Sequence, residues 1–162
     1  MSRFIPFVLY LFLIAMYEVI WRDFTALYLI AINVPAMLVV LVAIYKSELT
    51  AAWFGFIAGM VLSAGNPDGM GWQALLLAAI GIAVFHVREK LNLDSIYSKI
   101  LLIAGAILLH NLMSILINDL GRVLFLSWSY CLPSAIYTSL VAWLFFLFKE
   151  KKITLENIKS VF

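Results

Sequence analysis

The chain has 162 residues, of which 65% are hydrophobic and 12% are charged, and its formal net charge is +2. This composition leaves too little polar surface for a water-soluble domain, so it indicates a membrane protein. The charged residues lie mainly in short segments between six apolar runs, 4–20, 24–45, 49–64, 70–87, 100–117 and 123–148. A bilayer core of about 30 Å takes roughly 17–25 apolar residues as a helix. The sequence therefore predicts an all-α membrane protein, with one domain built as a bundle of six transmembrane helices.

The positions of lysine and arginine predict the orientation of this bundle. If the N-terminus is cytoplasmic, nine Lys and Arg residues lie in the inner segments, and only Arg22 and Arg122 lie in the outer ones. Short cytoplasmic segments carry the excess of positive charge in membrane proteins. We therefore expect both termini in the cytoplasm, with a short basic tail at 149–162 on anionic lipid. No small-residue cleavage site follows the first run, so we expect a retained helix there.

Polar residues and prolines interrupt the first two runs and the last one. Glu18 and Arg22 are four residues apart, in the order that favours a helical ion pair, at the expected outer boundary. Asn33 and Pro35 fall within the second run. Because proline lacks an N–H and clashes with the carbonyl four residues earlier, we expect a break there, with the Ala31 carbonyl bonded to Asn33 or to a neighbouring hydroxyl. Pro133 predicts a similar interruption in the last run, and such breaks are either simple kinks or the lining of a transport site.

The third run carries a small residue at every fourth position, which places these residues on one helical face. Gly55 and Gly59 form a GxxxG pair, a spacing that lets two helices approach closely in a membrane. Small residues also recur in the fourth run. We expect the two small faces either to pack on each other or to dock a partner's transmembrane helix; the candidates are Ala51, Gly55, Gly59, Ser63, Gly71, Ala74 and Ala78.

The third and fourth runs are joined by an expected outer turn, Gly65–Gly69. Its residues Asn66, Pro67 and Asp68 are typical of turns, because proline presets φ and the other two side chains hydrogen-bond nearby backbone. The two runs are therefore predicted to form a helical hairpin. Asp68 is either a solvated turn residue or a recognition residue.

His110 and Asn111 lie near the middle of the fifth run. Polar side chains inside a membrane usually face protein or water, so these two residues, with Asn33, are the intramembrane polar candidates. An interhelical hydrogen bond is the simpler interpretation, and a proton relay or a ligand contact is the alternative. The sequence has no metalloprotease, nucleophile-elbow, phosphate-loop or Cys/His metal motif, so we expect no enzymatic activity, no metal and no cofactor.

The segment from Gly55 to about Leu91 resembles the core of the rod shape-determining protein MreD family. The resemblance is carried by Gly55–Leu62, by the outer turn and by Gly71–Leu75. The family pattern has two glycines four apart, then an acidic residue, a short gap, and a glycine followed by an alanine–leucine step. This chain departs from it at Ser63, where the family commonly has an acidic residue, and Asp68 in the turn is the candidate replacement.

The resemblance implies a non-enzymatic scaffold in the bacterial inner membrane. Members of the family bind the bitopic protein MreC and help couple MreB filaments, indirectly, to peptidoglycan synthesis by RodA and a class B penicillin-binding protein. A partner helix would then use the small face of the third and fourth runs, near Gly59. The lipid bilayer is the other partner, and we expect no nucleic acid.

Two alternatives stay open. The substrate-binding subunits of energy-coupling-factor vitamin transporters are also six-helix bundles, and the overall shape is expected to be like theirs. However, they need a polar ligand pocket near the outer face, and they usually carry an alanine pair in the first helix, where this chain has only Ala15. The other alternative is a carrier that uses His110 and Asn111.

Overall fold

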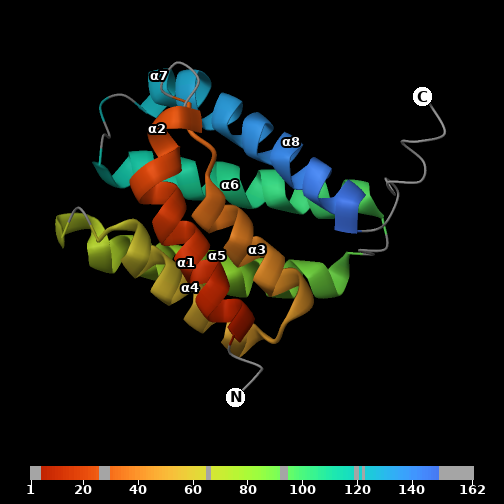
Figure 1. Ribbon diagram of the computed structural model, residues 1–162. Coiled ribbons are helices and arrows are strands. Elements are labelled where there is room, and N and C mark those ends of the chain that lie inside the picture. The colour runs from red at the N-terminus through yellow and green to blue at the C-terminus, as the bar shows by residue number, and fades with distance from the viewer. Residues whose placement is uncertain are drawn as a thin grey trace, which may run out of the picture.

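The computed structural model describes residues 5–25, 30–64, 67–91, 95–118, 121 and 123–149 (Figure 1). The regular elements within these ranges are helices, which confirms the all-α prediction. In chain order they are α1 (Ile5–Met16), the π-helical turn η1 (Tyr17–Trp21), α2 (Arg22–Thr25), α3 (Val34–Tyr45), α4 (Glu48–Leu62), α5 (Pro67–Lys90), α6 (Ile96–Asn118), α7 (Val123–Leu126), the π-helical turn η3 (Ser127–Cys131) and α8 (Leu132–Lys149).

Three helical segments are long and apolar enough to cross a membrane: Gly71–Lys90, Ile96–Asn118 and Ser127–Phe148. The described chain has three shorter apolar segments, Phe7–Trp21, Val34–Tyr45 and Glu48–Leu62. Several sequence predictions were wrong in their bounds; the fifth helix, for example, begins at Ile96 rather than at residue 100. The second run is not one helix over 24–45, because residues 31–33 are non-helical and α3 begins at Val34. The fourth helix begins at Pro67 rather than at residue 70, since proline suits the first turn of a helix.

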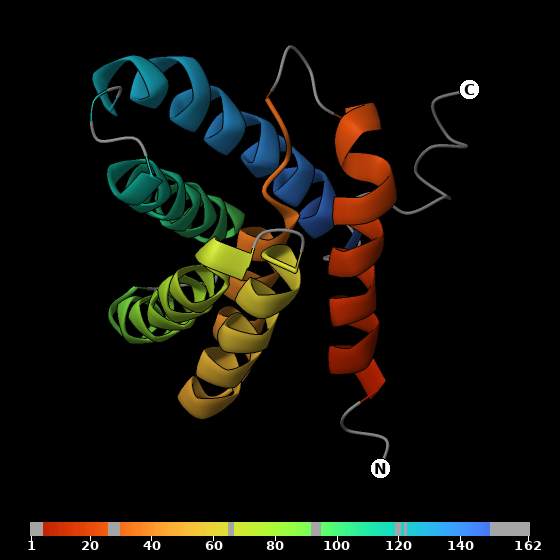
Figure 2. The same ribbon diagram turned by 90° about the vertical axis from the view of Figure 1, so that its left-hand side faces the viewer.

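Helix α3 lies at the centre of the bundle. Its side chains from Pro35 to Ile44 are all buried, and those of Ala36, Val39 and Val40 are fully so. The other helices surround it: Figure 2 shows α4, α5, α6 and α8 fanned around α3, with α1 on the opposite side of the fan. A helix that is apolar on every side is stable only in such a surrounded position.

The C-terminal end of α3 is capped by an arginine from α5. Arg88 Nη1 donates hydrogen bonds to the carbonyl oxygens of Ala43 and Ile44, at 2.7 and 2.6 Å. The same guanidinium lies over the ring of Phe85, 4.2 Å from its centroid. Terminal helix carbonyls have no partner within their own helix, so Arg88 satisfies them and fixes α5 against α3.

Helices α4 and α5 pack backbone to backbone through the small residues. A methyl group added at Gly55 would lie 2.5 Å from the carbonyl oxygen of Leu77, and one added at Gly59 would lie 2.5 Å from that of Gln73. Ala51, Ala74 and Ser63 are buried. Ala78 is half-buried beside Gly55, whereas Gly71 is exposed and a methyl group there would meet nothing within 4 Å. The internal-packing alternative therefore describes this face, and a partner helix cannot dock on it without displacing α5.

This packing predicts that Gly59→Leu destabilises the bundle itself. The new side chain must push α5 away, and overpacking of this kind costs roughly 1–3 kcal/mol or more. We expect a clear fall in the midpoint of thermal unfolding of the purified protein in detergent micelles.

Gly105→Leu is the matched control, because a methyl group at Gly105 on α6 would meet nothing within 4 Å. Equal unfolding midpoints for the two variants would contradict the close α4–α5 contact.

Candidate functional site

The break before α3 is stabilised by side chains of α3 itself and of α8. Asn33 is the N-cap residue, and its Oδ1 accepts a hydrogen bond from the Ala36 N–H at 3.1 Å. The Asn33 N–H donates to Thr138 Oγ1 at 3.0 Å, and Ser134 Oγ donates to the Ala31 carbonyl oxygen at 3.1 Å. The predicted break and the predicted hydroxyl partner for Ala31 are both confirmed. Non-helical backbone inside a helical bundle needs such partners, because it makes no helical hydrogen bonds.

The side chain of Asn33 also joins two polar residues of α6. Its Nδ2 lies 3.0 Å from His110 Nδ1 and donates to Asn111 Oδ1 at 2.9 Å. Because Asn33 Nδ2 is a donor, His110 Nδ1 accepts, and the ring proton sits on Nε2, which lies 3.2 Å from Gln73 Oε1 on α5. This is the hydrogen-bonding pattern of a neutral imidazole. His110 and Asn111 therefore make the interhelical hydrogen bonds that the simpler interpretation predicted.

The hydroxyls of Ser134 and Thr138 extend this network. We call the whole network the polar cluster (Asn33, Gln73, His110, Asn111, Ser134 and Thr138). Asn111 Nδ2 donates to Ser134 Oγ at 3.3 Å, and Thr138 Oγ1 donates to the Ser134 carbonyl at 2.7 Å. His110, Asn111, Ser134 and Thr138 are all buried. The cluster connects α3, α5, α6 and α8, so it fixes the relative positions of four helices.

A cavity of about 390 Å³, which we call the polar pocket, opens beside the cluster. Its walls come from η1, α2, the 31–33 segment, α4, α5, α6 and η3. Glu18 and Arg22 form the predicted ion pair at 3.0 Å on one wall. The polar side chains that line the pocket are Glu18, Arg22, Asn33, Ser63, Gln73, His110, Asn111, Ser114, Asn118 and Tyr130.

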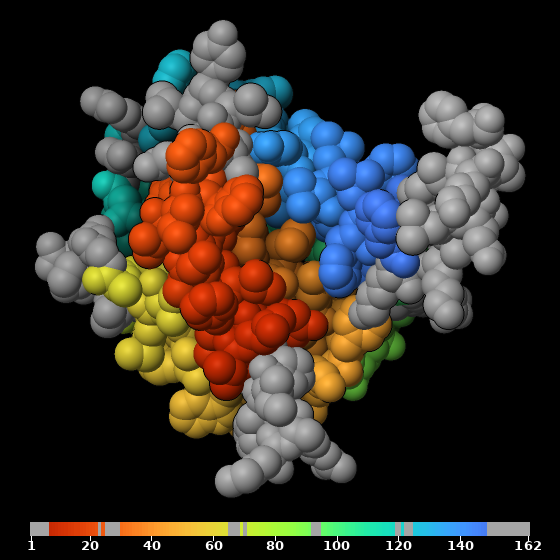
Figure 3. All heavy atoms as spheres, viewed as in Figure 1, coloured from red at the N-terminus to blue at the C-terminus, as the bar shows by residue number. Residues whose placement is uncertain are grey.

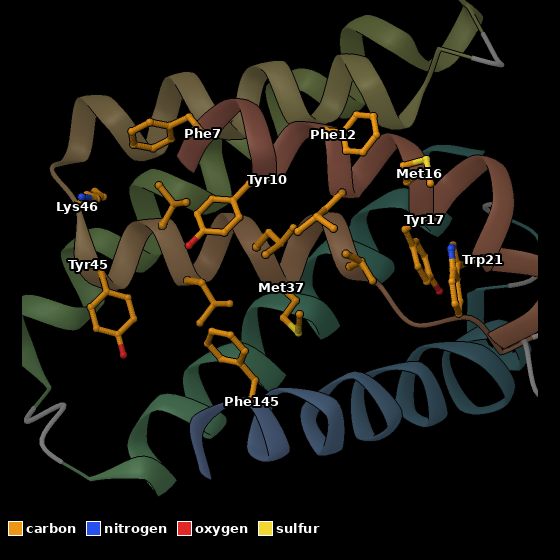
Figure 4. A pocket seen from close by; sticks show the side chains of 15 residues that line it. Phe7, Tyr10, Phe12, Met16, Tyr17, Trp21, Met37, Tyr45, Lys46 and Phe145 are labelled. Carbon is orange, nitrogen blue, oxygen red and sulfur yellow. The ribbon is translucent and has the colours of Figure 1, made fainter. Parts of the chain in front are cut away.

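A second cavity, the apolar groove, has a volume of about 770 Å³ and lies between α1, α3 and α8. Helix α1 leans on α4 through Phe7 and Tyr10, whose rings lie 6.1 and 6.3 Å from that of Phe54. Space therefore remains between α1 and α8. Figure 3 shows atoms of α3 between these two helices. Figure 4 shows the groove side chains, among them Met37 from α3 and Phe145 from α8.

Some of the other predicted residues lie wholly or partly outside the residues that the structure describes. Asn66 lies outside the described residues, as do the side chains of Pro67 and Asp68, so a recognition role for the outer turn stays a prediction. The basic tail after residue 149 also lies outside the described residues. Among the described residues, no group of three or more His, Cys, Asp or Glu side chains could hold a metal ion.

Sequence analysis missed several members of the polar cluster and the pocket. Gln73, Ser114, Ser134 and Thr138 are each an isolated polar residue in or beside an apolar run, and isolated polar residues of this kind are the signal that could have found them. The sequence predicted that Glu18 pairs with Arg22 at the boundary, but not that it shares a pocket with His110. Glu18 and His110 meet only through the packing of their helices, which the sequence does not show. Comparisons with protein-family models, with curated proteins and with solved structures find no match to the chain.

The cluster predicts a stability loss in Asn33→Ala. This change removes the cap of α3 and leaves His110 Nδ1 without its donor inside the bundle, and an unsatisfied buried group costs about 1–3 kcal/mol. We expect a lower midpoint of thermal unfolding in micelles.

The matched control is Asn118→Ala, because Asn118 is exposed and its Nδ2 bonds only to the Ser114 carbonyl of its own helix among the described residues, at 2.8 Å. If both variants unfold at the same temperature, Asn33 does not hold the bundle together.

Proposed function

We propose that the chain is a non-enzymatic, MreD-like scaffold of the bacterial cell-elongation machinery, which binds the transmembrane helix of a bitopic MreC protein. The observation that carries the proposal is the apolar groove between α1, α3 and α8. The resemblance over Gly55–Leu91 supports the choice of family and therefore of partner. Through MreC the scaffold would act with RodA and a class B penicillin-binding protein, and indirectly with MreB filaments.

The groove suits a single transmembrane helix in shape. Its lining on α1 and η1 extends from Phe7 to Trp21, which at about 1.5 Å per residue is a length of about 22 Å. This is most of the ~30 Å apolar core of a bilayer. Lipid tails are as apolar as a helix, so helices associate in membranes by close packing. A concave surface offers a partner helix more contact atoms than a flat one, and each contact adds dispersion energy.

The groove lining is suited to such packing rather than to lipid alone. Phe12 and Leu13 on α1 are 62% and 47% exposed, and Phe145 on α8, which also lines the groove, is 42% exposed. Aromatic side chains supply large contact areas with few rotatable bonds, which is why they are enriched at protein interfaces. The groove thus replaces the small face of α4 as the docking surface, because α5 already covers that face.

The proposal includes a specific membrane arrangement. Six helical segments cross the inner membrane, with both termini in the cytoplasm and the α4–α5 turn outside. The three shorter segments span with help from their flanking residues: α1 continues through η1 and α2 to Thr25, and α3 is preceded by the 31–33 segment. This arrangement agrees with the distribution of Lys and Arg along the chain.

Filling the groove predicts loss of the partner. Leu13→Trp places an indole in the groove, so we expect recovery of MreC with the tagged protein from native membranes to fall about tenfold or more. A tenfold fall corresponds to a loss of about 1.4 kcal/mol of binding free energy.

Leu101→Trp is the matched control, because Leu101 on α6 is 73% exposed and does not line the groove. Equal recovery of MreC with both variants would remove the groove as the docking surface, and no MreC with the unmodified chain after cross-linking would remove the scaffold function.

The membrane arrangement predicts which cysteines a membrane-impermeant maleimide can reach. In a Cys131→Ala background, we expect Asp68→Cys to react in cells with an opened outer membrane, and Lys46→Cys to react only after the inner membrane is permeabilised. Labelling of Lys46→Cys in intact inner membranes would reverse the orientation.

A substrate-binding subunit of an energy-coupling-factor transporter is the second candidate, and the polar pocket is the observation that favours it. Such subunits hold their substrate in a polar pocket, and here the pocket is lined by carboxamides and hydroxyls. The same cross-linking experiment separates the two candidates, because this one predicts recovery of a coupling subunit with its ATPases in place of MreC.

A further inference from the structure

The polar pocket contains more hydrogen-bonding groups than helix packing uses. The hydroxyls of Ser63 and Tyr130 line it, and neither makes a hydrogen bond with the described part of the chain. Ser63 is nevertheless only 5% exposed. The Oγ of Ser63 is not one of the fully buried side-chain atoms that lack a partner, so it remains accessible from the pocket. These hydroxyls are therefore available to a molecule in the pocket.

Gln73 adds a donor next to an acceptor. Its Oε1 has two lone pairs, of which His110 Nε2–H takes one. Its Nε2 has two protons, and the bond from Nε2 to Ser114 Oγ is long, at 3.5 Å. The amide thus retains an N–H and a carbonyl lone pair, and it lines the pocket. An amide with both groups available pairs with a ligand edge that carries a donor beside an acceptor, as Gln and Asn do with nucleobase edges.

The charges around the pocket favour an uncharged ligand. Glu18 and Arg22 neutralise each other in their ion pair at 3.0 Å. His110 has the bonding pattern of a neutral ring, with Nδ1 accepting from Asn33 and Nε2 donating to Gln73. A ligand with a net charge would lose its hydration without gaining a counter-charge from these groups, which is costly inside the bundle.

We propose that the polar pocket binds a small uncharged molecule with an amide-type edge, such as a pyrimidine or nicotinamide ring, through Gln73 and the hydroxyls of Ser63 and Ser114. The volume of about 390 Å³ lies within the range of small-molecule pockets, roughly 300–1,000 Å³. Arg22 on the pocket wall is half-exposed, whereas Glu18 beside it is mostly buried. This inference goes beyond the scaffold function and does not rest on it, and it gives a ligand class to the site that favours the second candidate.

Thermal unfolding of the full chain in micelles tests the ligand class, with uracil and nicotinamide as probes. A molecule that binds only the folded state raises the unfolding midpoint as its concentration rises. We expect at least one probe to do so with saturation. We expect 1,3-dimethyluracil, which keeps the ring and the carbonyls of uracil but has no N–H, to have no effect. No shift with either probe, or a shift with 1,3-dimethyluracil equal to that with uracil, would overturn the proposal.

Two variants test the location of the site. Gln73→Leu removes the amide edge, and we expect the affinity for the probe to fall about tenfold, as for two lost neutral hydrogen bonds. Because this change also removes the partner of His110, Ser63→Ala is the second variant. The Ser63 hydroxyl has no hydrogen-bond partner among the described residues, so its loss leaves the fold intact while the affinity falls about fivefold.

Ser129→Ala is the matched control, because Ser129 is exposed on η3 and bonds to the Phe125 carbonyl of its own helix. Unchanged affinity in both Gln73→Leu and Ser63→Ala would place the probe elsewhere and overturn the proposal. Recovery of MreC with the same variants reports separately on the scaffold function, because neither residue lines the apolar groove.

Discussion

The structure depends on the satisfaction of backbone polar groups inside the helical bundle. Pro35 stops α3 from extending toward the N-terminus, and the 31–33 segment therefore enters the bundle without helical hydrogen bonds. The hydroxyls of Ser134 and Thr138 supply the missing partners for Ala31 and Asn33. A buried backbone group left without a partner costs about 1–3 kcal/mol, so the contact with α8 stabilises this segment. The rest of the polar cluster, and the pocket next to it, follow from that placement.

Close packing on one side of α3 leaves space on the other. Gly55 and Gly59 let α4 and α5 form a tight hairpin against α3, and Arg88 fixes the far end of α5 to the end of α3. Helix α1 follows this hairpin through the ring of Phe54, so it is drawn away from α8. The apolar groove is the space that this asymmetry leaves. One tight hairpin thus accounts both for the covering of the small face of α4 and for the open groove between α1 and α8.

Sequence reasoning predicted the features that depend on local pattern. The apolar runs, the break at Asn33 and Pro35, the Glu18–Arg22 pair and the meeting of the two small faces all follow from spacing along the chain. The bounds of α3 were wrong, because hydropathy does not distinguish an extended apolar segment from a helix. The bond between Gln73 and His110 joins residues that are 37 positions apart. It depends on how two helices are rotated about their axes, and a single sequence does not contain that rotation. The groove depends on the tilt of α1. This tilt is set by contacts between helices, and a single sequence does not contain it either.

The pairing of the 31–33 segment with α8 has a consequence for the order in which this protein is made. The hydrogen bonds of Asn33 and Ala31 reach partners 105 and 103 residues later in the chain. Helix α3 has 12 residues, too few to cross a bilayer without that segment. Until α8 leaves the ribosome, the backbone groups of Ala31 and Asn33 lack these partners. The final arrangement of the bundle is therefore reached only after α8 has been synthesised.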